Sequence, residues 1–246
     1  NKMIDLYKGD CLEVMKGIES GSVDAIICDP PYGTTACKWD SVIDFDLMWE
    51  QLNRIIKPNG AIVLFGSEPF SSALRMSNIK NYKYDWIWDK NVGSNLFQAK
   101  IQPLKVHEII SVFYKKQPTY NPNMIKKNKE QKQGTYKNTN NSSAVTNKIN
   151  KNKIAGKIYT HSYPKTIQGF KKDKGSKNKH PTQKPIALME YLIKTYTNEN
   201  ETVLDFTMGS GSTGVAAKQT NRKFIGIEQD EKYFNIATER INGTLF

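Results

Sequence analysis

The 246-residue sequence contains few histidines and cysteines and no long apolar run. Its three histidines lie far apart, so no cluster typical of a metal site is present and we expect no metal. The three cysteines, Cys11, Cys28 and Cys37, are odd in number and have no paired spacing, which predicts reduced thiols and a cytoplasmic setting. No apolar run could cross a bilayer and no charged leader precedes one, so we expect no membrane association.

Acidic residues are scarce in residues 121–179, which carry 15 lysines but only Glu130 and Asp173. This segment holds the positive excess of a chain whose net charge is +12. Its lysines could neutralise the phosphates of double-stranded DNA, although a solvated, lysine-rich linker is the alternative interpretation. The candidate phosphate contacts and base-reaching side chains are Lys126, Lys127, Lys151, Lys153, Tyr159, His161, Tyr163, Lys171 and Lys172.

The tetrapeptide Asp29-Pro30-Pro31-Tyr32 follows an apolar run at residues 23–28. The run indicates a buried strand that stops abruptly, because proline supplies no donor to a sheet and fixes φ. Open α/β sheets bind their ligands at the carboxyl ends of strands. There the tetrapeptide would present a carboxylate, carbonyl oxygens and an aromatic ring, which suit a planar base held by its exocyclic amine. A loop acid before a plain Pro-Pro turn is the alternative.

A glycine-rich turn near the carboxyl end forms the second motif. Gly209, Gly211 and Gly214 match G-x-G-x-x-G, so a nicotinamide-binding loop has to be considered. However, Asp205 ends the expected strand 201–205 four residues before the first glycine, and Glu228 ends the next expected strand. Two strand-end acids around a turn of small residues describe a nucleoside pocket for S-adenosylmethionine, where glycines let the backbone approach the ligand.

Together these motifs resemble the DNA methyltransferases that modify exocyclic amino groups, in their circularly permuted β group. Residues 8–12 resemble the element that contacts the adenine of the cofactor, and residues 180–185, His-Pro-Thr-Gln-Lys-Pro, resemble the segment that cradles its methionine end. Residues 61–67, 86–91 and 107–113 are similar to the sheet strands of the family. One departure is Phe206-Thr207, where the family usually has Pro-Phe.

The resemblance implies one α/β domain, a doubly wound, mostly parallel, Rossmann-like sheet that is circularly permuted. Residues 1–120 would form its catalytic half, residues 121–179 a lysine-rich target-recognition insertion, and residues 180–246 its cofactor-binding half. We expect strands near residues 4–7, 201–205 and 223–228, and helices near 12–18, 46–57, 186–196, 213–220 and 231–241. Only two strands follow the insertion, whereas a nicotinamide fold of ordinary order would need more after its glycines.

The activity implied is site-specific transfer of a methyl group from S-adenosylmethionine to the N6 amine of a flipped adenine. The catalytic candidates are Asp29, Pro30, Pro31 and Tyr32. The cofactor-binding candidates are Asp10, Cys11, Lys184, Asp205, Phe206, Thr207, Gly209, Ser210, Gly211, Ser212, Thr213 and Glu228.

Several alternatives to this activity stay open. They are an N4-cytosine DNA methyltransferase, an RNA adenine methyltransferase, a non-catalytic DNA-binding regulator and a nicotinamide oxidoreductase. A regulator would have no reason to keep the whole Asp29–Tyr32 loop and the cofactor acids, and an oxidoreductase would not need Asp-Pro-Pro-Tyr. The sequence also leaves open whether the chain forms a homodimer and whether a restriction endonuclease accompanies it.

Overall fold

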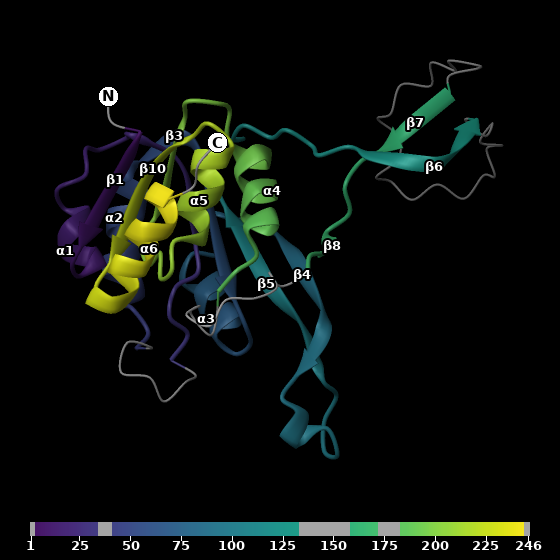
Figure 1. Ribbon diagram of the computed structural model, residues 1–246, viewed down its shortest axis with the longest axis horizontal. Helices are drawn as coiled ribbons and strands as arrows, with labels where there is room; N and C mark the ends of the chain where they lie inside the picture. The colour runs from purple at the N-terminus through teal and green to yellow at the C-terminus, as the bar shows by residue number, and fades with distance from the viewer. Residues whose placement is uncertain (1–2, 34–40, 133–157, 172–182, 244–246) are drawn as a thin grey trace. The chain divides into compact units, whose positions relative to one another are not determined.

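The computed structural model describes residues 3–33, 41–132, 158–171 and 183–243 (Figure 1). The chain divides into two compact units. The larger unit takes the chain up to Asn121 and again from Lys165 onward, and the smaller unit is Pro122–Pro164. Each unit is described by itself below.

The larger unit is built on an eight-stranded sheet with the order β1-β10-β9-β2-β3-β5-β4-β8. Strand β5 is antiparallel to both of its neighbours, and every other pairing in this sheet is parallel. The prediction of a mostly parallel α/β sheet is therefore confirmed. The strands are β1 (Ile4–Lys8), β2 (Val23–Cys28), β3 (Ile56–Gly66), β4 (Tyr82–Ser94), β5 (Lys105–Phe113), β8 (Ile167–Gly169), β9 (Thr202–Asp205) and β10 (Lys223–Glu228).

Helices cover both faces of the sheet, as a doubly wound fold requires. Side chains of β2 alternate between two buried clusters, with Ala25 and Ile27 in one and Ile26 and Cys28 in the other. The first cluster includes residues of α4 (Ile186–Tyr196), α5 (Ser212–Gln219) and α6 (Glu231–Gly243). The second includes residues of α1 (Cys11–Met15), α2 (Phe45–Ile55) and α3 (Phe70–Ser77). The central strand is thus buried on both sides, which explains its continuous apolar sequence.

Two predicted helices end earlier than the sequence suggested. Helix α2 ends at Ile55, because Ile56 is extended and pairs with Val23 of β2. The predicted helical end at 56–57 was therefore wrong, and Pro58 lies inside β3 instead of terminating a helix. Helix α1 ends at Met15 and is followed by a turn instead of continuing to Ile18. The other predicted helices and strands occur within a few residues of their expected ends.

Strands β4 and β5 were predicted as separate segments and form one long antiparallel pair, with the short 3-10 helix η1 (Leu96–Gln98) between them (Figure 1). In the smaller unit, β6 (Ile125–Lys132) pairs antiparallel with β7 (Ile158–Ser162). No helix among the described residues is long and apolar enough to cross a membrane. No group of three histidine, cysteine or acidic side chains that could hold a metal occurs in the described ranges.

Candidate active site

The carboxyl ends of the neighbouring strands β2, β9 and β10 surround a cavity of about 320 Å³. This volume lies within the range of small-molecule sites. The predicted catalytic loop and cofactor loop, although about 180 residues apart in the chain, both line it because their strands are adjacent and parallel. The lining includes Asp10, Cys11, Asp29, Pro30, Pro31, Tyr32, Lys184, Asp205, Phe206, Thr207, Gly209, Ser210, Ser212, Thr213 and Glu228.

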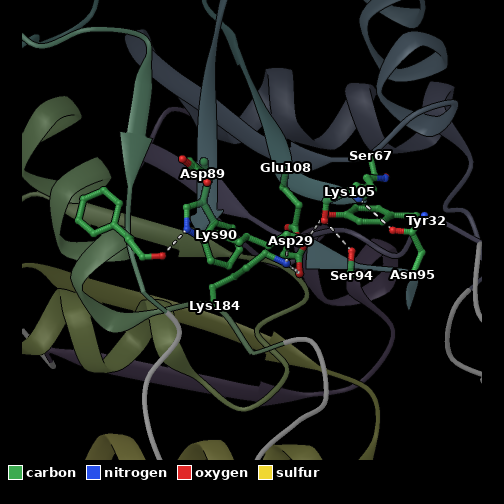
Figure 2. Close-up of polar contacts among 12 residues, drawn as sticks. Asp29, Tyr32, Ser67, Asp89, Lys90, Ser94, Asn95, Lys105, Glu108 and Lys184 are labelled. Atoms are coloured by element: carbon green, nitrogen blue, oxygen red, sulfur yellow. Dashed lines mark hydrogen bonds and ion pairs between the residues drawn. The ribbon is translucent and has the colours of Figure 1, made fainter. Parts of the chain in front are cut away.

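The Asp29 carboxylate accepts hydrogen bonds from the Tyr32 hydroxyl and from the Lys184 ammonium (Figure 2). Burial raises the pKa of Asp29 above its usual value, and the adjacent positive charge of Lys184 opposes that rise. The Asp29 carbonyl oxygen accepts a hydrogen bond of 3.0 Å from the Thr207 hydroxyl. The loop is therefore held by Lys184 and by Thr207, and its carboxylate can accept hydrogen bonds from a bound amine.

Tyr32 packs its ring against Phe70 of α3, with ring centroids 5.0 Å apart and planes tilted by 33°. Its hydroxyl lies on Asp29, and burial raises the pKa of Tyr32 well above its ordinary value. The tyrosine is thus supported by one aromatic neighbour while it also lines the cavity. Stacking on a flipped base stays a prediction for this ring.

The two strand-end acids organise the cofactor loop. The Asp205 carboxylate accepts hydrogen bonds from the Thr207 backbone N–H and the Thr213 hydroxyl. The Glu228 carboxylate accepts from the backbone N–H groups of Gly209 and Asp230, at 2.9 and 2.8 Å. Burial raises the pKa of Asp205 to about 6. Each carboxylate oxygen can still accept a second hydrogen bond, so these acids can shape the loop and meet a ligand together.

One polar group in this loop suits a ligand. The Ser212 hydroxyl lines the cavity at the start of α5, is buried, and makes no hydrogen bond to any described residue. A buried hydroxyl without a partner is costly, so a bound polar molecule would satisfy it. With the carboxylates of Asp205 and Glu228 nearby, this donor and acceptor set fits the hydroxyl and amino groups of S-adenosylmethionine.

Two predicted cofactor residues support the local structure, and for Asp10 this is the helix-capping role that its sequence position also allowed. The Asp10 carboxylate caps α1 by accepting from the backbone N–H groups of Leu12 and Glu13, at 2.9 and 3.2 Å. Gly211 does not line the cavity, and a Cβ there would lie 2.9 Å from that of Ala237. Because the φ of Gly211 is +79°, the turn requires glycine for its own geometry and its packing on α6.

Phe206 and Thr207, which stand where the family usually has Pro-Phe, have different surroundings in the structure. The Phe206 side chain is completely buried in the core, whereas the Thr207 hydroxyl reaches the Asp29 carbonyl and lies 3.0 Å from the Cys28 sulfur. Burial raises the pKa of Cys28 well above that of a free thiol, and the pKa of Cys11 rises to about 12 for the same reason. Both cysteines are therefore neutral core or lining residues.

Lys184 and Glu108 were not expected to meet. The Lys184 ammonium lies 3.2 Å from a carboxylate oxygen of Glu108, besides its contact with Asp29. Glu108 belongs to β5 and was predicted only as part of a strand. A carboxylate directly before the apolar residues of β5 was the available signal, but its partners depend on contacts between distant segments. Phe70, which supports Tyr32, had no signal in the sequence.

The predicted DNA-binding residues fall in different parts of the chain. Lys126, Lys127, His161 and Tyr163 belong to the smaller unit, where Lys126 pairs with His161 across β6 and β7. The Tyr163 side chain is 73% exposed. Tyr159 lies in β7, and Lys171 is an exposed residue of the larger unit. Lys151, Lys153 and Lys172 lie outside the described residues, so their role stays a prediction.

The family described as DNA methylase (N6_N4_Mtase) matches residues 23–239, which include both loops of the cavity. The chain belongs to this DNA methylase family. Family membership therefore favours a methyltransferase over the nicotinamide enzyme that the glycine spacing alone allowed.

Relatives and solved structures resemble this DNA methylase over nearly its whole length. The type II methyltransferase M.HinfI of Haemophilus influenzae is 29% identical, over 96% of this chain and 67% of the relative. M2.DpnII of Streptococcus pneumoniae is 28% identical, over 98% and 90%. The M1.HpyAVI–SAM complex has a TM-score of 0.63 at 29% identity and covers 98% of this chain and 100% of that one. The PvuII DNA methyltransferase, described as cytosine-N4-specific, has a TM-score of 0.69 at 16% identity over 98% and 86%, a likeness of fold alone.

Proposed function

We propose that this DNA methylase transfers a methyl group from S-adenosylmethionine to the N6 amine of an adenine flipped out of double-stranded DNA. The observation that carries the proposal is the shared cavity, in which the Asp29 carboxylate and the loop between Asp205 and Thr213 face the same space. A cofactor held by that loop and an amine held by Asp29 would be neighbours, and proximity and orientation supply much of the rate in such a transfer.

The amine of adenine is a poor nucleophile because its lone pair is delocalised into the ring. The Asp29 carboxylate and the Pro30 carbonyl would each accept one of its N–H groups, which draws the nitrogen toward tetrahedral geometry and frees the lone pair. Tyr32 would stack on the flipped base. When bound, S-adenosylmethionine supplies the electrophilic methyl group. As positive charge develops on the nitrogen, the ionised Asp29 would stabilise it. The methyl–sulfur bond would break as the methyl–nitrogen bond forms, S-adenosylhomocysteine would leave, and the surplus N–H proton would pass to water.

The cofactor would be held by other residues that line the same cavity. Glu228 would accept hydrogen bonds from the ribose hydroxyls, as acids at the end of this strand do in nucleoside-binding α/β folds. The Ser212 hydroxyl, which has no partner among the described residues, would gain one from the ligand. Asp205 would hold the loop in the conformation that receives it, since its carboxylate joins Thr207 to Thr213.

The amines of adenine and cytosine present the same two donors, so the chemistry of the loop does not separate them. We prefer adenine because Asp-Pro-Pro-Tyr resembles the form that is usual in the adenine enzymes. Fold does not separate the two, since the PvuII enzyme with cytosine-N4 specificity has a similar fold. The test is methylation of mixed-sequence DNA with labelled S-adenosylmethionine, followed by mass spectrometry of the nucleosides. We expect N6-methyladenine, and N4-methylcytosine alone would overturn the choice of base. The same assay with an equal amount of RNA distinguishes an RNA methyltransferase from a DNA methyltransferase.

The lysine-rich residues 121–179 are proposed to bring the DNA to this cavity. The rest of the chain is nearly neutral, so it has little general attraction for a polyanion. The exposed Lys126 and Lys171 would meet phosphates, while aromatic residues such as Tyr163 would contact bases. Because the curated relatives are named type II methyltransferases, a restriction endonuclease that cuts the unmethylated sequence is the partner we propose.

A further inference from the structure

Four charged side chains form a connected chain beside the cavity, in the order Lys90, Glu108, Lys184 and Asp29 (Figure 2). The Lys90 ammonium lies 3.4 Å from Oε1 of Glu108, and the Lys184 ammonium lies 3.2 Å from Oε2. The side chains of Lys90 and Lys184 are only 8% and 7% exposed, and that of Glu108 is 16% exposed. Two positive and two negative charges are therefore balanced where unpaired charges would be costly.

One acceptor in this chain of charges is unused. Glu108 Oε2 is buried and makes no hydrogen bond within the described ranges, although the Lys184 nitrogen lies at hydrogen-bonding distance. Lys184 is thus paired with Glu108 by charge at 3.2 Å, while its side-chain hydrogen bond goes to Asp29. An ammonium has three donors at the end of a flexible side chain, so a small shift of Lys184 would bring one of them onto Oε2. The Phe65 ring, whose centroid lies 5.2 Å from the same nitrogen, favours a cation at this position.

Asp29, in contrast, already has both carboxylate oxygens in use. Tyr32 donates to Oδ1 and Lys184 donates to Oδ2. Each oxygen keeps a second acceptor position, but a substrate amine binds Asp29 more strongly when one of the two donors already on the carboxylate moves away. Lys184 is the donor that has another carboxylate within reach.

We propose that Glu108 is a positioning residue that accepts Lys184 when the substrate amine binds Asp29. Lys184 moves its hydrogen bond from Asp29 to Oε2 of Glu108, and Asp29 becomes free to accept the amine. The lysine remains close enough to keep Asp29 ionised, and Lys90 balances the charge of Glu108 throughout. This inference rests on the proposed methyltransferase function, and it adds a residue for which the sequence predicted no role.

The two neighbours of Asp29 act on its acidity in opposite directions. The negative charge of Glu108 raises the pKa of Asp29, and the positive charge of Lys184 lowers it, on top of the rise that burial causes. Tyr32, Cys28 and Asp205 also face Asp29. Variants at Glu108 or Lys184 leave these three groups in place. Shifts of the Asp29 pKa in opposite directions would therefore identify the contributions of Glu108 and Lys184.

The experiment compares Glu108→Gln, Glu108→Asp and Lys184→Met in single-turnover methyl transfer to DNA across a range of pH. Transfer requires ionised Asp29, so the rate falls on the acid side as this group takes up a proton. In Glu108→Gln we expect a rate about tenfold lower, because the neutral amide competes poorly with Asp29 for Lys184. The acid limb should move to lower pH in Glu108→Gln and to higher pH in Lys184→Met. Glu108→Asp keeps the charge and should restore the acid limb to its wild-type position.

Controls separate this role from a structural one. Glu190→Gln removes a carboxylate that pairs with Lys194 on α4 at 3.5 Å, away from the cavity, and should leave both rate and pH profile unchanged. S-adenosylmethionine affinity, measured by calorimetry, should stay within about threefold of wild type in Glu108→Gln. Normal circular dichroism with this affinity shows that the variant is folded.

A second measurement does not depend on methyl transfer. The protein with ¹³C-labelled aspartate carboxyl groups is titrated by NMR without DNA, and the Asp29 signal is assigned from Asp29→Asn. The titration midpoint of Asp29 should fall in Glu108→Gln and rise in Lys184→Met. An unchanged midpoint in Glu108→Gln, or a wild-type rate with an unmoved acid limb, would overturn the proposal. If the wild-type protein methylates no DNA, the proposed function fails while the titration still tests the chain of charges.

Discussion

The Thr207 hydroxyl donates a hydrogen bond to the Asp29 carbonyl oxygen across 3.0 Å, so one side chain connects the cofactor loop to the catalytic loop. Thr207 is also where the sequence departs from its family, which usually has phenylalanine there. We therefore expect Thr207 to help orient the proposed catalytic loop, a role that composition and spacing could not indicate.

Thr207→Val should slow methyl transfer about three- to tenfold, because it removes a hydrogen bond worth about 1 kcal/mol while keeping the shape of the side chain. Affinity for S-adenosylmethionine should change much less, because the bond that the variant lacks is made to the catalytic loop. Single-turnover assays and calorimetry measure the two effects. Thr207→Ser is the matched control and should retain most of the rate; equal losses in both variants would contradict a role for the hydroxyl.

Asp29→Ala should reduce methyl transfer by at least 100-fold with cofactor affinity nearly intact. The carboxylate is the proposed acceptor for the target amine, whereas Asp205 and Glu228 organise the cofactor loop. Labelled methyl transfer and calorimetry on the same preparation provide the comparison. A variant that keeps its rate within about tenfold of wild type, a loss below about 1.4 kcal/mol, would exclude the catalytic assignment.

The strands that carry both loops could be predicted because their signal is local. Apolar runs that end in Asp29, Asp205 and Glu228 give the positions of β2, β9 and β10, and the parallel order then brings these acids to one edge. The end of α2 could not be predicted in the same way. Ile56 continues the apolar stripe of a helix but pairs with Val23 of a different segment, and that tertiary pairing overrides the helical pattern.

The partners of the charged side chains could not be predicted from the sequence for the same reason. Glu108 lies opposite Trp88 in the antiparallel pairing of β4 and β5, a register that the sequence does not specify. Its contact with Lys184 further requires that this lysine, two residues before α4, lie at the cavity. The sequence can supply the residue types of such a network, but the three-dimensional pairing decides which charges meet.

Glu228→Ala should weaken S-adenosylmethionine binding at least tenfold. The change removes the proposed acceptor for the ribose hydroxyls and also leaves the Gly209 and Asp230 backbone N–H groups without their carboxylate partner. Calorimetry measures the affinity. Glu231→Gln, which alters an exposed carboxylate paired with Lys8, should bind the cofactor normally. Unchanged affinity in a folded Glu228→Ala variant would exclude this acid from the binding site.

Asp205 should make the stability of the free protein depend on pH. Its pKa in the folded state is about 6, above the unfolded value near 3.9, so folding favours the protonated form. The contribution of protonated Asp205 to the free energy of unfolding is fully present below about pH 4 and is lost as pH rises through 6. The loss is at most about 3 kcal/mol. Asp205→Asn cannot ionise and should gain stability relative to wild type between pH 4 and 7. Urea unfolding at several pH values measures the free energy of unfolding of both proteins, with Glu239→Gln, at an exposed position, as the control. If the stability difference between Asp205→Asn and wild type narrowed as pH rose, the prediction would be wrong.

Deleting residues 123–153 should weaken DNA binding far more than cofactor binding. Residues 121–179 hold the positive excess of the chain, and each lysine that meets a phosphate releases counterions. The slope of log affinity against log salt should therefore shrink by roughly 0.9 for each phosphate that the shortened protein no longer neutralises. Sequence choice should depend more on residues 158–170, because specific side chains read base edges. DNA affinity measured at several salt concentrations distinguishes a DNA-binding segment from a passive linker, and calorimetry of S-adenosylmethionine binding is the control. An unchanged salt slope with intact methylation would mean that the deleted segment never touches DNA.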